Sequence, residues 1–250
     1  MITRKTPDQI ALMRRAGKVV AEMHEECIRA AKPGASTLDV DAVAREVIDR
    51  RGARSNFLGY HGFPAVVCTS PNGVIVHGIP SADVVLEDGD ILSIDCGAII
   101  EGWHADAAVT VPIGDIDEES QRLIDVTRES LEAAIEQVVE GKRLGDVGAA
   151  VEGRAEAAGF TVVREYVGHG IGTAMHEEPQ VPNYGPAGKG MKLKEGLVLA
   201  IEPMVNAGGA ETEVLGDGWT VITRDGRRSA HFEHTIAVTH NGPEVLTLPE

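Results

Sequence analysis

An apolar stretch that carries two aspartates is the strongest constraint on how this chain can fold. The segment IDCGAIIEGWHAD, residues 94–106, has a Glu-Gly turn signal in its middle and therefore predicts a β-hairpin. Side chains alternate across a strand, so Asp95 and Asp106 share one face if the loop has an even number of residues. Neighbouring buried carboxylates repel each other and need a shared proton, cations or a metal. The hairpin therefore predicts a convergent carboxylate pair with a positively charged partner.

The residues around these aspartates help to distinguish a buried carboxylate pair from aspartates at the surface. A turn-capping Asp together with a solvent-facing Asp would also fit the sequence, but the apolar residues beside Asp95 disfavour a surface position for it. Cys96 falls on the opposite face by alternation. His104 shares the face of Asp106 by the same rule, so alternation does not exclude it as a further ligand.

The composition excludes several classes of protein. A net charge of -16 argues against broad binding to a phosphate backbone, although a local basic patch could still dock on a nucleic-acid-containing particle. No window approaches 18 apolar residues, and the start MITRKTPDQIALMRRAG lacks the apolar core of a signal peptide. We therefore expect a soluble cytoplasmic protein. Three widely spaced cysteines without a CxxC pattern agree with a reducing compartment: Cys27, Cys68 and Cys96.

Helix and strand signals alternate along the chain. Strand patterns fill residues 57–113 and return from residue 160 onward. We expect Thr6 to cap the first helix and Thr37 or Asp39 to cap the second. The closing segment 219–239 predicts a hairpin whose turn is an Asp-Gly pair. The sequence predicts four helices, at residues 7–31, 38–52, 117–140 and 144–158.

The order of helix pair, strands, helix pair, strands suggests a repeat. Aligned at an offset of 107 residues, the two helix pairs share seven of 28 positions. Two interpretations stay open: caps and terminal glycines recur in any helix pair, or an internal duplication places two α-β halves, about 1–115 and 116–250, across one site. No linker or low-complexity segment divides the chain, so we expect a single domain over residues 1–250.

Three further residues stand out for their settings. In VGHGIGTAMHEEPQ, glycines flank His169 on both sides and allow close backbone approach. Glu202 ends the apolar run GLVLAIEPM, and Glu233 lies inside the predicted strand AHFEHTIAVT. Each alone would usually be a structural or exposed residue. Neither His-Glu pair of the chain has the second His that the zincin motif HExxH requires.

Taken together, these side chains are typical of a dinuclear metal site. Two divalent cations would neutralise four converging carboxylates. Oxygen-rich ligands with one imidazole suit Mn, Fe or Co, with Zn also possible. Two metal ions roughly 3.5–4 Å apart are the arrangement that aminopeptidases and other dinuclear hydrolases use. The candidate ligands are Asp95, Asp106, His169, Glu202 and Glu233.

The ordered motifs resemble those of type I methionine aminopeptidases over essentially the whole chain. IDCGAIIEGWHAD, GHGIG, IEPM and FEHT contain the five candidate ligands, and GYHGFP, NGVIVHGIP and HEEPQVPNYG extend the match. The resemblance implies the α+β pita-bread fold, an antiparallel sheet flanked by helices, with halves related by a pseudo-twofold axis. It also implies a cytoplasmic catalytic domain that removes the initiator methionine from nascent polypeptides with a small second residue. We further expect the short form of the family, which starts at the catalytic domain and lacks an N-terminal zinc-binding extension.

The same resemblance implies roles for particular residues. Two divalent ions (Co, Mn, Fe or Zn) would be bound by Asp95, Asp106, His169, Glu202 and Glu233, and a hydroxide that bridges them would attack the first peptide bond. His77, His176 and Glu202 would be catalytic. Substrate would be bound by His77, His176, Tyr60, Phe63, Cys68 and Trp219. This chain has Phe57 where some family members have Cys, and Met175 where some have Phe.

The resemblance also implies few partners: a monomer, transient ribosome contact, no membrane and no sequence-specific nucleic-acid binding. Two rivals share the implied fold. A proline-specific peptidase usually carries a long extra N-terminal domain, for which 250 residues leave no room. A non-catalytic binding homologue would be expected to lose ligands, whereas all five candidates are present. A structural protein with acidic strand residues by chance is the remaining alternative.

Overall fold

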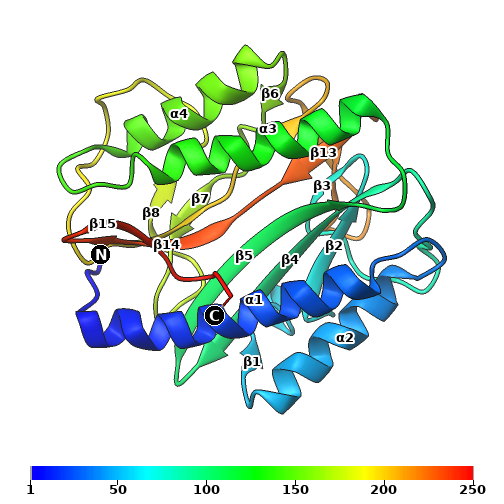
Figure 1. The fold of residues 1–250 in the computed structure, drawn as a ribbon, viewed down its shortest axis with the longest axis horizontal. Coiled ribbons are helices and arrows are strands. Elements are labelled where there is room, and N and C mark those ends of the chain that lie inside the picture. The colour runs from blue at the N-terminus through cyan, green and yellow to red at the C-terminus, as the bar shows by residue number, and fades with distance from the viewer. Residues whose placement is uncertain (1, 250) are drawn as a thin grey trace.

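The computed structural model describes residues 2–249, which form four long helices and a set of antiparallel strands (Figure 1). The mixed α+β composition agrees with the predicted fold class. None of the helices in this described range is long and apolar enough to cross a membrane. The helices are α1 (Pro7–Ala30), α2 (Thr37–Arg50), α3 (Glu118–Ile135) and α4 (Leu144–Ala157).

Helix boundaries follow local capping chemistry, with two corrections. Thr6 caps α1 as expected, in a capping box with Gln9. The cap of α2 is Ser36, so the expectation of Thr37 or Asp39 was wrong; Asp39 instead supplies the reciprocal bond to the backbone of Ser36. Helix α3 ends at Ile135 rather than at residue 140, because the amides of Gln137 and Val138 bond to carbonyls three residues back, which tightens the last turn.

The first half is built around the predicted hairpin. Strands β4 (Ile91–Ile100) and β5 (Trp103–Pro112) are joined by Glu101-Gly102, both with positive φ, as a two-residue hairpin turn requires. Asp95 pairs with Ala108, and Gly97 pairs with Asp106. The loop therefore has an even number of residues, and the two aspartates lie on one face as predicted. Strands β1 (Arg54–Ser55) and β2 (Val67–Pro71) flank β4.

The second half is built around a five-stranded sheet in the order β15-β14-β9-β7-β8. Its strands are β7 (Gly168–Gly170), β8 (Glu177–Val181), β9 (Val198–Ile201), β14 (His234–Thr239) and β15 (Gly242–Val245). Two three-stranded sheets contain β3 (Val74–Val76), β6 (Thr161–Val162), β10 (Met204–Asn206), β11 (Thr212–Val214), β12 (Val221–Thr223) and β13 (Ser229–His231). A short 3-10 turn, η1 (Tyr60–Gly62), precedes β2.

The predicted closing hairpin over residues 219–239 is wrong. The chain does turn at its Asp-Gly pair, but β12 joins β3 and β11, whereas β13 joins β10. The turn between β2 and β3 accounts for the separation: the carbonyl of Gly73 accepts from Thr223, and the carbonyl of Asn72 accepts from Ser229. These backbone partners occupy the hydrogen-bonding groups that the two arms would otherwise share.

The two halves repeat at the predicted spacing. Helix α2 begins at residue 37 and α4 at 144, and strand β4 begins at 91 and β9 at 198, so both differences equal 107. Helices α1 and α2 cover the sheet of the first half, and α3 and α4 lie against the second (Figure 1). One apolar core lies under α1 and α2, and a second, which also includes Ile91 of β4, lies under α3 and α4.

Two helical glycines test the packing of these cores. A Cβ at Gly17 in α1 would lie 2.0 Å from the carbonyl oxygen of Leu246, whereas nothing lies within 4 Å of a Cβ at Gly153 in α4. We expect Gly17→Ala to lower the free energy of unfolding by about 1–3 kcal/mol. Gly153→Ala should raise it by about 0.5–1 kcal/mol through helix propensity. Urea unfolding of both variants checks this; equal effects would contradict it.

Candidate active site

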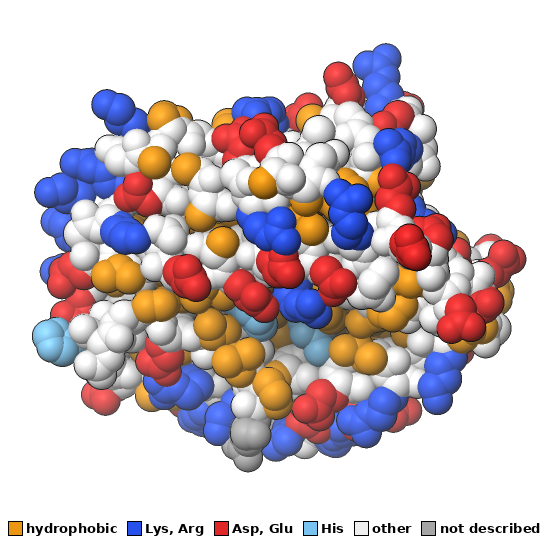
Figure 2. Space-filling model, turned by 45° about the horizontal axis from the view of Figure 1, so that its top comes forward, with side chains coloured by type: hydrophobic (Ala, Val, Ile, Leu, Met, Phe, Trp, Pro, Cys, Tyr) orange, Lys and Arg blue, Asp and Glu red, His pale blue; other side chains and the backbone are white. Residues whose placement is uncertain are grey.

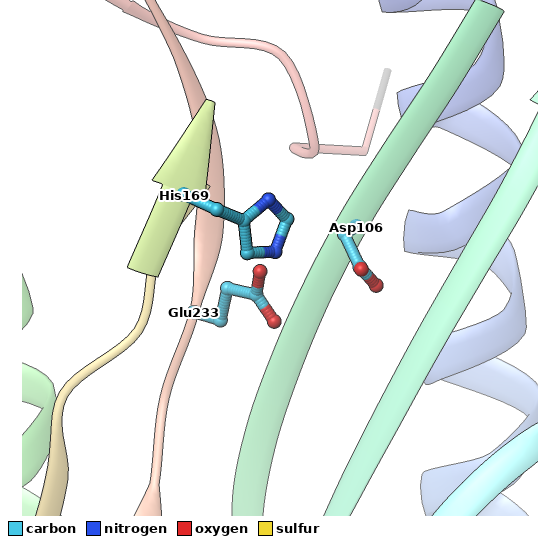
Figure 3. A group of neighbouring side chains, drawn as sticks. All are labelled: Asp106, His169 and Glu233. Atoms are coloured by element: carbon cyan, nitrogen blue, oxygen red, sulfur yellow. The ribbon is translucent and has the colours of Figure 1, made fainter. Parts of the chain in front are cut away.

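The five candidate metal ligands come from both halves and line one cavity of about 400 Å³. Asp95 lies on β4 and Asp106 on β5, while His169 lies on β7. Glu202 follows β9, and Glu233 lies between β13 and β14, where its backbone pairs with that of Ala108 on β5. Figure 3 shows Asp106 on β5 and His169 on β7 beside Glu233, which lies in the segment between β13 and β14.

Three of these side chains form a tight cluster. Ligand atoms of Asp106, His169 and Glu233 all lie within 4.8 Å of one another, and each residue is less than a tenth exposed. The Nε2 atom of His169 is also 3.5 Å from Oε1 of Glu202. The cluster is therefore small and dry enough to hold a cation by direct coordination.

The hydrogen-bonding pattern fits a metal. Buried oxygens of Asp95, Asp106 and Glu233 have no hydrogen-bond partner within residues 2–249, although buried polar atoms are normally paired. The Nδ1 atom of His169 lies 2.9 Å from the carbonyl oxygen of Gly170. A carbonyl can only accept, so the ring proton is on Nδ1 and Nε2 keeps the lone pair that a metal needs.

Electrostatics point to the same conclusion. Burial raises the pKa of Asp95 from 3.8 to about 7. Burial and the neighbouring carboxylates raise the pKa values of Asp106, Glu202 and Glu233 well above their usual range. Burial lowers the pKa of His169 to about 3, so its imidazole is neutral. Without a cation the carboxyl groups keep protons, and a bound divalent cation would let them ionise.

The predicted substrate residues form the other wall of this cavity. Tyr60, Phe63, Cys68, His77, His176 and Trp219 all line it, and so do Phe57 and Met175. The rings of Phe63 and Trp219 meet edge to face at 5.1 Å, and those of His77 and Trp219 at 6.2 Å. The cavity therefore has an acidic floor and an apolar, largely aromatic wall.

Sequence reasoning missed three residues near the cavity. His61 lines it and follows Tyr60 in the quoted motif GYHGFP, so that motif could have indicated it. Tyr166 packs its ring 5.8 Å from that of His77 and gave no local signal. His231 is buried, with Nε2 3.9 Å from Oε2 of Glu202. Strand alternation from Glu233 could have identified His231.

The other candidates on the hairpin lie elsewhere. Cys96 packs in the apolar core beneath α1 and α2, on the opposite face from Asp95 as alternation predicts. His104 is not among the side chains that line the cavity, although it shares a face with Asp106. All three cysteines are free and buried.

A second groove offers no comparable ligand set. It measures about 420 Å³ and lies between α1 and α3, with His24 and His234 among mostly apolar side chains (Figure 2). In the part of the chain that the structure describes, the cluster at Asp106 is the one group of at least three His, Cys, Asp or Glu side chains with ligand atoms close enough to share a metal.

Known structures establish the architecture. Prolidase from Pyrococcus furiosus superposes with a TM-score of 0.80 over 99% of this chain and 66% of its own, at 22% identity. A methionine aminopeptidase from Thermotoga maritima superposes with a TM-score of 0.98 at 46% identity, over 99% of this chain and all of its own. The predicted pita-bread fold is thereby confirmed.

Sequence comparison establishes the family. The model of metallopeptidase family M24 matches residues 11–240. The methionine aminopeptidase of Clostridium acetobutylicum is 50% identical over 250 residues, which covers both chains completely. The cavity described above has the acidic cluster expected of such enzymes. The chain thus belongs to metallopeptidase family M24 and, within it, to the type I methionine aminopeptidases.

Proposed function

We propose that this chain removes the N-terminal initiator methionine from nascent proteins and peptides, with preference for a small second residue. One observation carries the proposal: a single cavity joins an acidic cluster that could hold a cation to an apolar wall. The floor suits a hydrolytic metal centre, and the wall suits an unbranched thioether side chain. The close identity to methionine aminopeptidases supports the same activity.

The five ligands have the right chemistry for two divalent cations of the Mn, Fe, Co or Zn type. The resemblance to methionine aminopeptidases implies that Asp106 and Glu233 would contact both ions, and their close approach to His169 supports a place for them in the metal site. When bound, such a pair polarises a scissile carbonyl and lowers the pKa of water toward neutrality.

Side chains of the cavity carry out proton transfer, oxyanion stabilisation and substrate binding. Glu202 takes a proton from the attacking water and delivers it to the leaving amine, which its position beside His169 supports. His176 donates a hydrogen bond to the oxyanion, and His77 orients the peptide. The aromatic wall with Tyr60 and Trp219 holds the methionine side chain. Discrimination against one extra methylene is worth only about 1–3 kcal/mol, so similar apolar residues are cleaved slowly.

The proposal includes the domain organisation, the cellular location and the oligomeric state of the protein. Residues 1–250 act as one catalytic domain in the cytoplasm, as a monomer that meets nascent chains during transient ribosome contact. The absence of a membrane-spanning helix in residues 2–249 is compatible with this setting. The net charge of -16 supports the expectation that sequence-specific nucleic-acid binding plays no part.

The decisive experiment is metal reconstitution. Metal-free protein is loaded separately with Co, Mn, Fe and Zn and assayed on Met-Ala-Ser, on a Met-Leu peptide and on an Xaa-Pro peptide. We expect cleavage of Met-Ala-Ser with at least one metal, much slower cleavage of the Met-Leu peptide and none of the Xaa-Pro peptide. Preference for Xaa-Pro would instead indicate a proline-specific peptidase, and inactivity with every metal would indicate a binding protein.

Loss of one bridging ligand should be severe. Asp106→Asn removes a charged ligand from the buried cluster, so we expect kcat/KM on Met-Ala-Ser to fall more than about 100-fold, beyond the effect typical of outer-shell partners. Metal bound per chain, measured by atomic emission, should fall as well. The matched variant Asp115→Asn alters an exposed carboxylate just beyond β5 and should leave both quantities unchanged. Full activity in Asp106→Asn would refute its role.

The acidic floor also predicts an unusual pH dependence for the metal-free protein. Because folding raises the pKa of Asp95 from 3.8 to about 7, the native state binds more protons than the unfolded state between these values. The protonated Asp95 therefore makes its full contribution to the free energy of unfolding below about pH 4, and this contribution is lost as the pH rises through about 7. Urea unfolding across this range should show a smaller loss in Asp95→Asn than in the wild type. Metal loading should abolish the loss; identical slopes would contradict the prediction.

A further inference from the structure

The imidazole of His176 is held by a tyrosine. The Oη atom of Tyr60 lies 2.8 Å from Nδ1 of His176, and the two ring centroids are 5.5 Å apart. On its other side, the ring of His176 meets that of His169 at 4.2 Å. A hydrogen bond to one nitrogen and a ring contact together fix the orientation of this side chain, which lines the cavity.

Tyr60 itself sits on a tightly constrained turn. Gly59 has φ +82°, His61 has φ +47° and Gly62 has φ +90°, so three left-handed residues surround it. The amide of Gly59 donates a hydrogen bond to the carbonyl of Phe63, and the amide of Phe63 donates one to the carbonyl of Tyr60. A positive φ is uncommon for a residue other than glycine, and here it is retained next to the cavity. The phenol is therefore positioned by the backbone before any substrate enters.

Two neighbouring histidines of this cavity have partners of opposite chemistry. His169 faces the carbonyl of Gly170, which accepts a hydrogen bond from Nδ1–H and leaves Nε2 with a lone pair. His176 faces a hydroxyl, which can donate. Within residues 2–249, Nδ1 of His176 is the one hydrogen-bond partner of Oη of Tyr60, so the phenol has a single protein acceptor within reach. A neutral imidazole that accepts at Nδ1 must carry its own proton on Nε2.

We propose that Tyr60 is a positioning residue that donates its O–H to Nδ1 of His176 and thereby holds this imidazole as the Nε2–H tautomer. This inference rests on the proposed function of the same site. Once the four carboxylates and the lone pair of His169 hold cations they offer no hydrogen-bond donor, whereas a scissile carbonyl needs a donor as negative charge develops on its oxygen. The Nε2–H of His176 supplies that donor, and Tyr60 does more than line the methionine pocket.

The tautomer can be measured without turnover. Two-bond ¹H–¹⁵N correlation spectra of the zinc-loaded protein separate protonated from unprotonated imidazole nitrogens, and His176→Gln assigns the signals. We expect a protonated Nε2 in the wild type and a mixture of both tautomers in Tyr60→Phe. A protonated Nδ1 in the wild type, or an unchanged spectrum in Tyr60→Phe, overturns the proposal.

Kinetics on Met-Ala-Ser separate positioning from pocket lining. Tyr60→Phe keeps the ring, so we expect kcat to fall about 10–100-fold, as outer-shell partners typically do, with little change in KM. A raised KM with unchanged kcat would mean that Tyr60 is only a wall of the pocket. The matched variant Tyr184→Phe should have no effect, because this hydroxyl makes no hydrogen bond within the described residues and its ring packs under Arg164 away from the cavity. If wild-type enzyme does not cleave Met-Ala-Ser, the proposed function fails, while the spectra still decide the tautomer.

Discussion

Repulsion among four neighbouring carboxylates, two of them buried and two partly buried, is the constraint on which the rest of this structure depends. Such a cluster persists only if the backbone holds each carboxyl group in place from a different element. The register of the hairpin directs Asp95 and Asp106 to one face. The backbone of Glu233 pairs with β5, which brings the second half against the first. The hydroxyl of Thr235 on β14 also bonds to both the amide and the carbonyl of Asp106. The acidic floor is thus built by the contact between the halves.

Close packing around His169 serves the same floor. A Cβ at Gly168 would lie 2.4 Å from the carbonyl oxygen of Ala200, and one at Gly170 would lie 2.3 Å from that of Glu178. The two flanking glycines therefore let β7 fit between β8 and β9. This is the close backbone approach that the glycines around His169 suggest in the sequence. The imidazole enters the cavity from a strand that has no room for larger neighbours.

His169 and His176 both line the cavity, and the hydrogen-bonding partner of each imidazole favours either a metal-ligand nitrogen or a hydrogen-bond donor nitrogen. A backbone carbonyl beside His169 favours a ligand nitrogen, and a phenol beside His176 favours a donor nitrogen. His169 is buried and His176 is more exposed, but desolvation is the largest cause that lowers the pKa of each ring, which favours the neutral imidazole in both. The different hydrogen-bonding partners are therefore one physical reason for the different roles of the two rings.

Local rules in the sequence determined a large part of this protein. Alternation placed Asp95 and Asp106 on one face, the repeat of 107 residues anticipated the two halves, and the motifs around His169, Glu202 and Glu233 indicated one cavity. The tertiary structure alone decided the rest. The arms around Asp225-Gly226 diverge because Asn72 and Gly73 occupy their hydrogen-bonding groups. The contact of Tyr60 with His176 joins residues 116 positions apart. Neither follows from a local pattern, because such pairings depend on which distant backbone and side-chain groups the fold brings into reach.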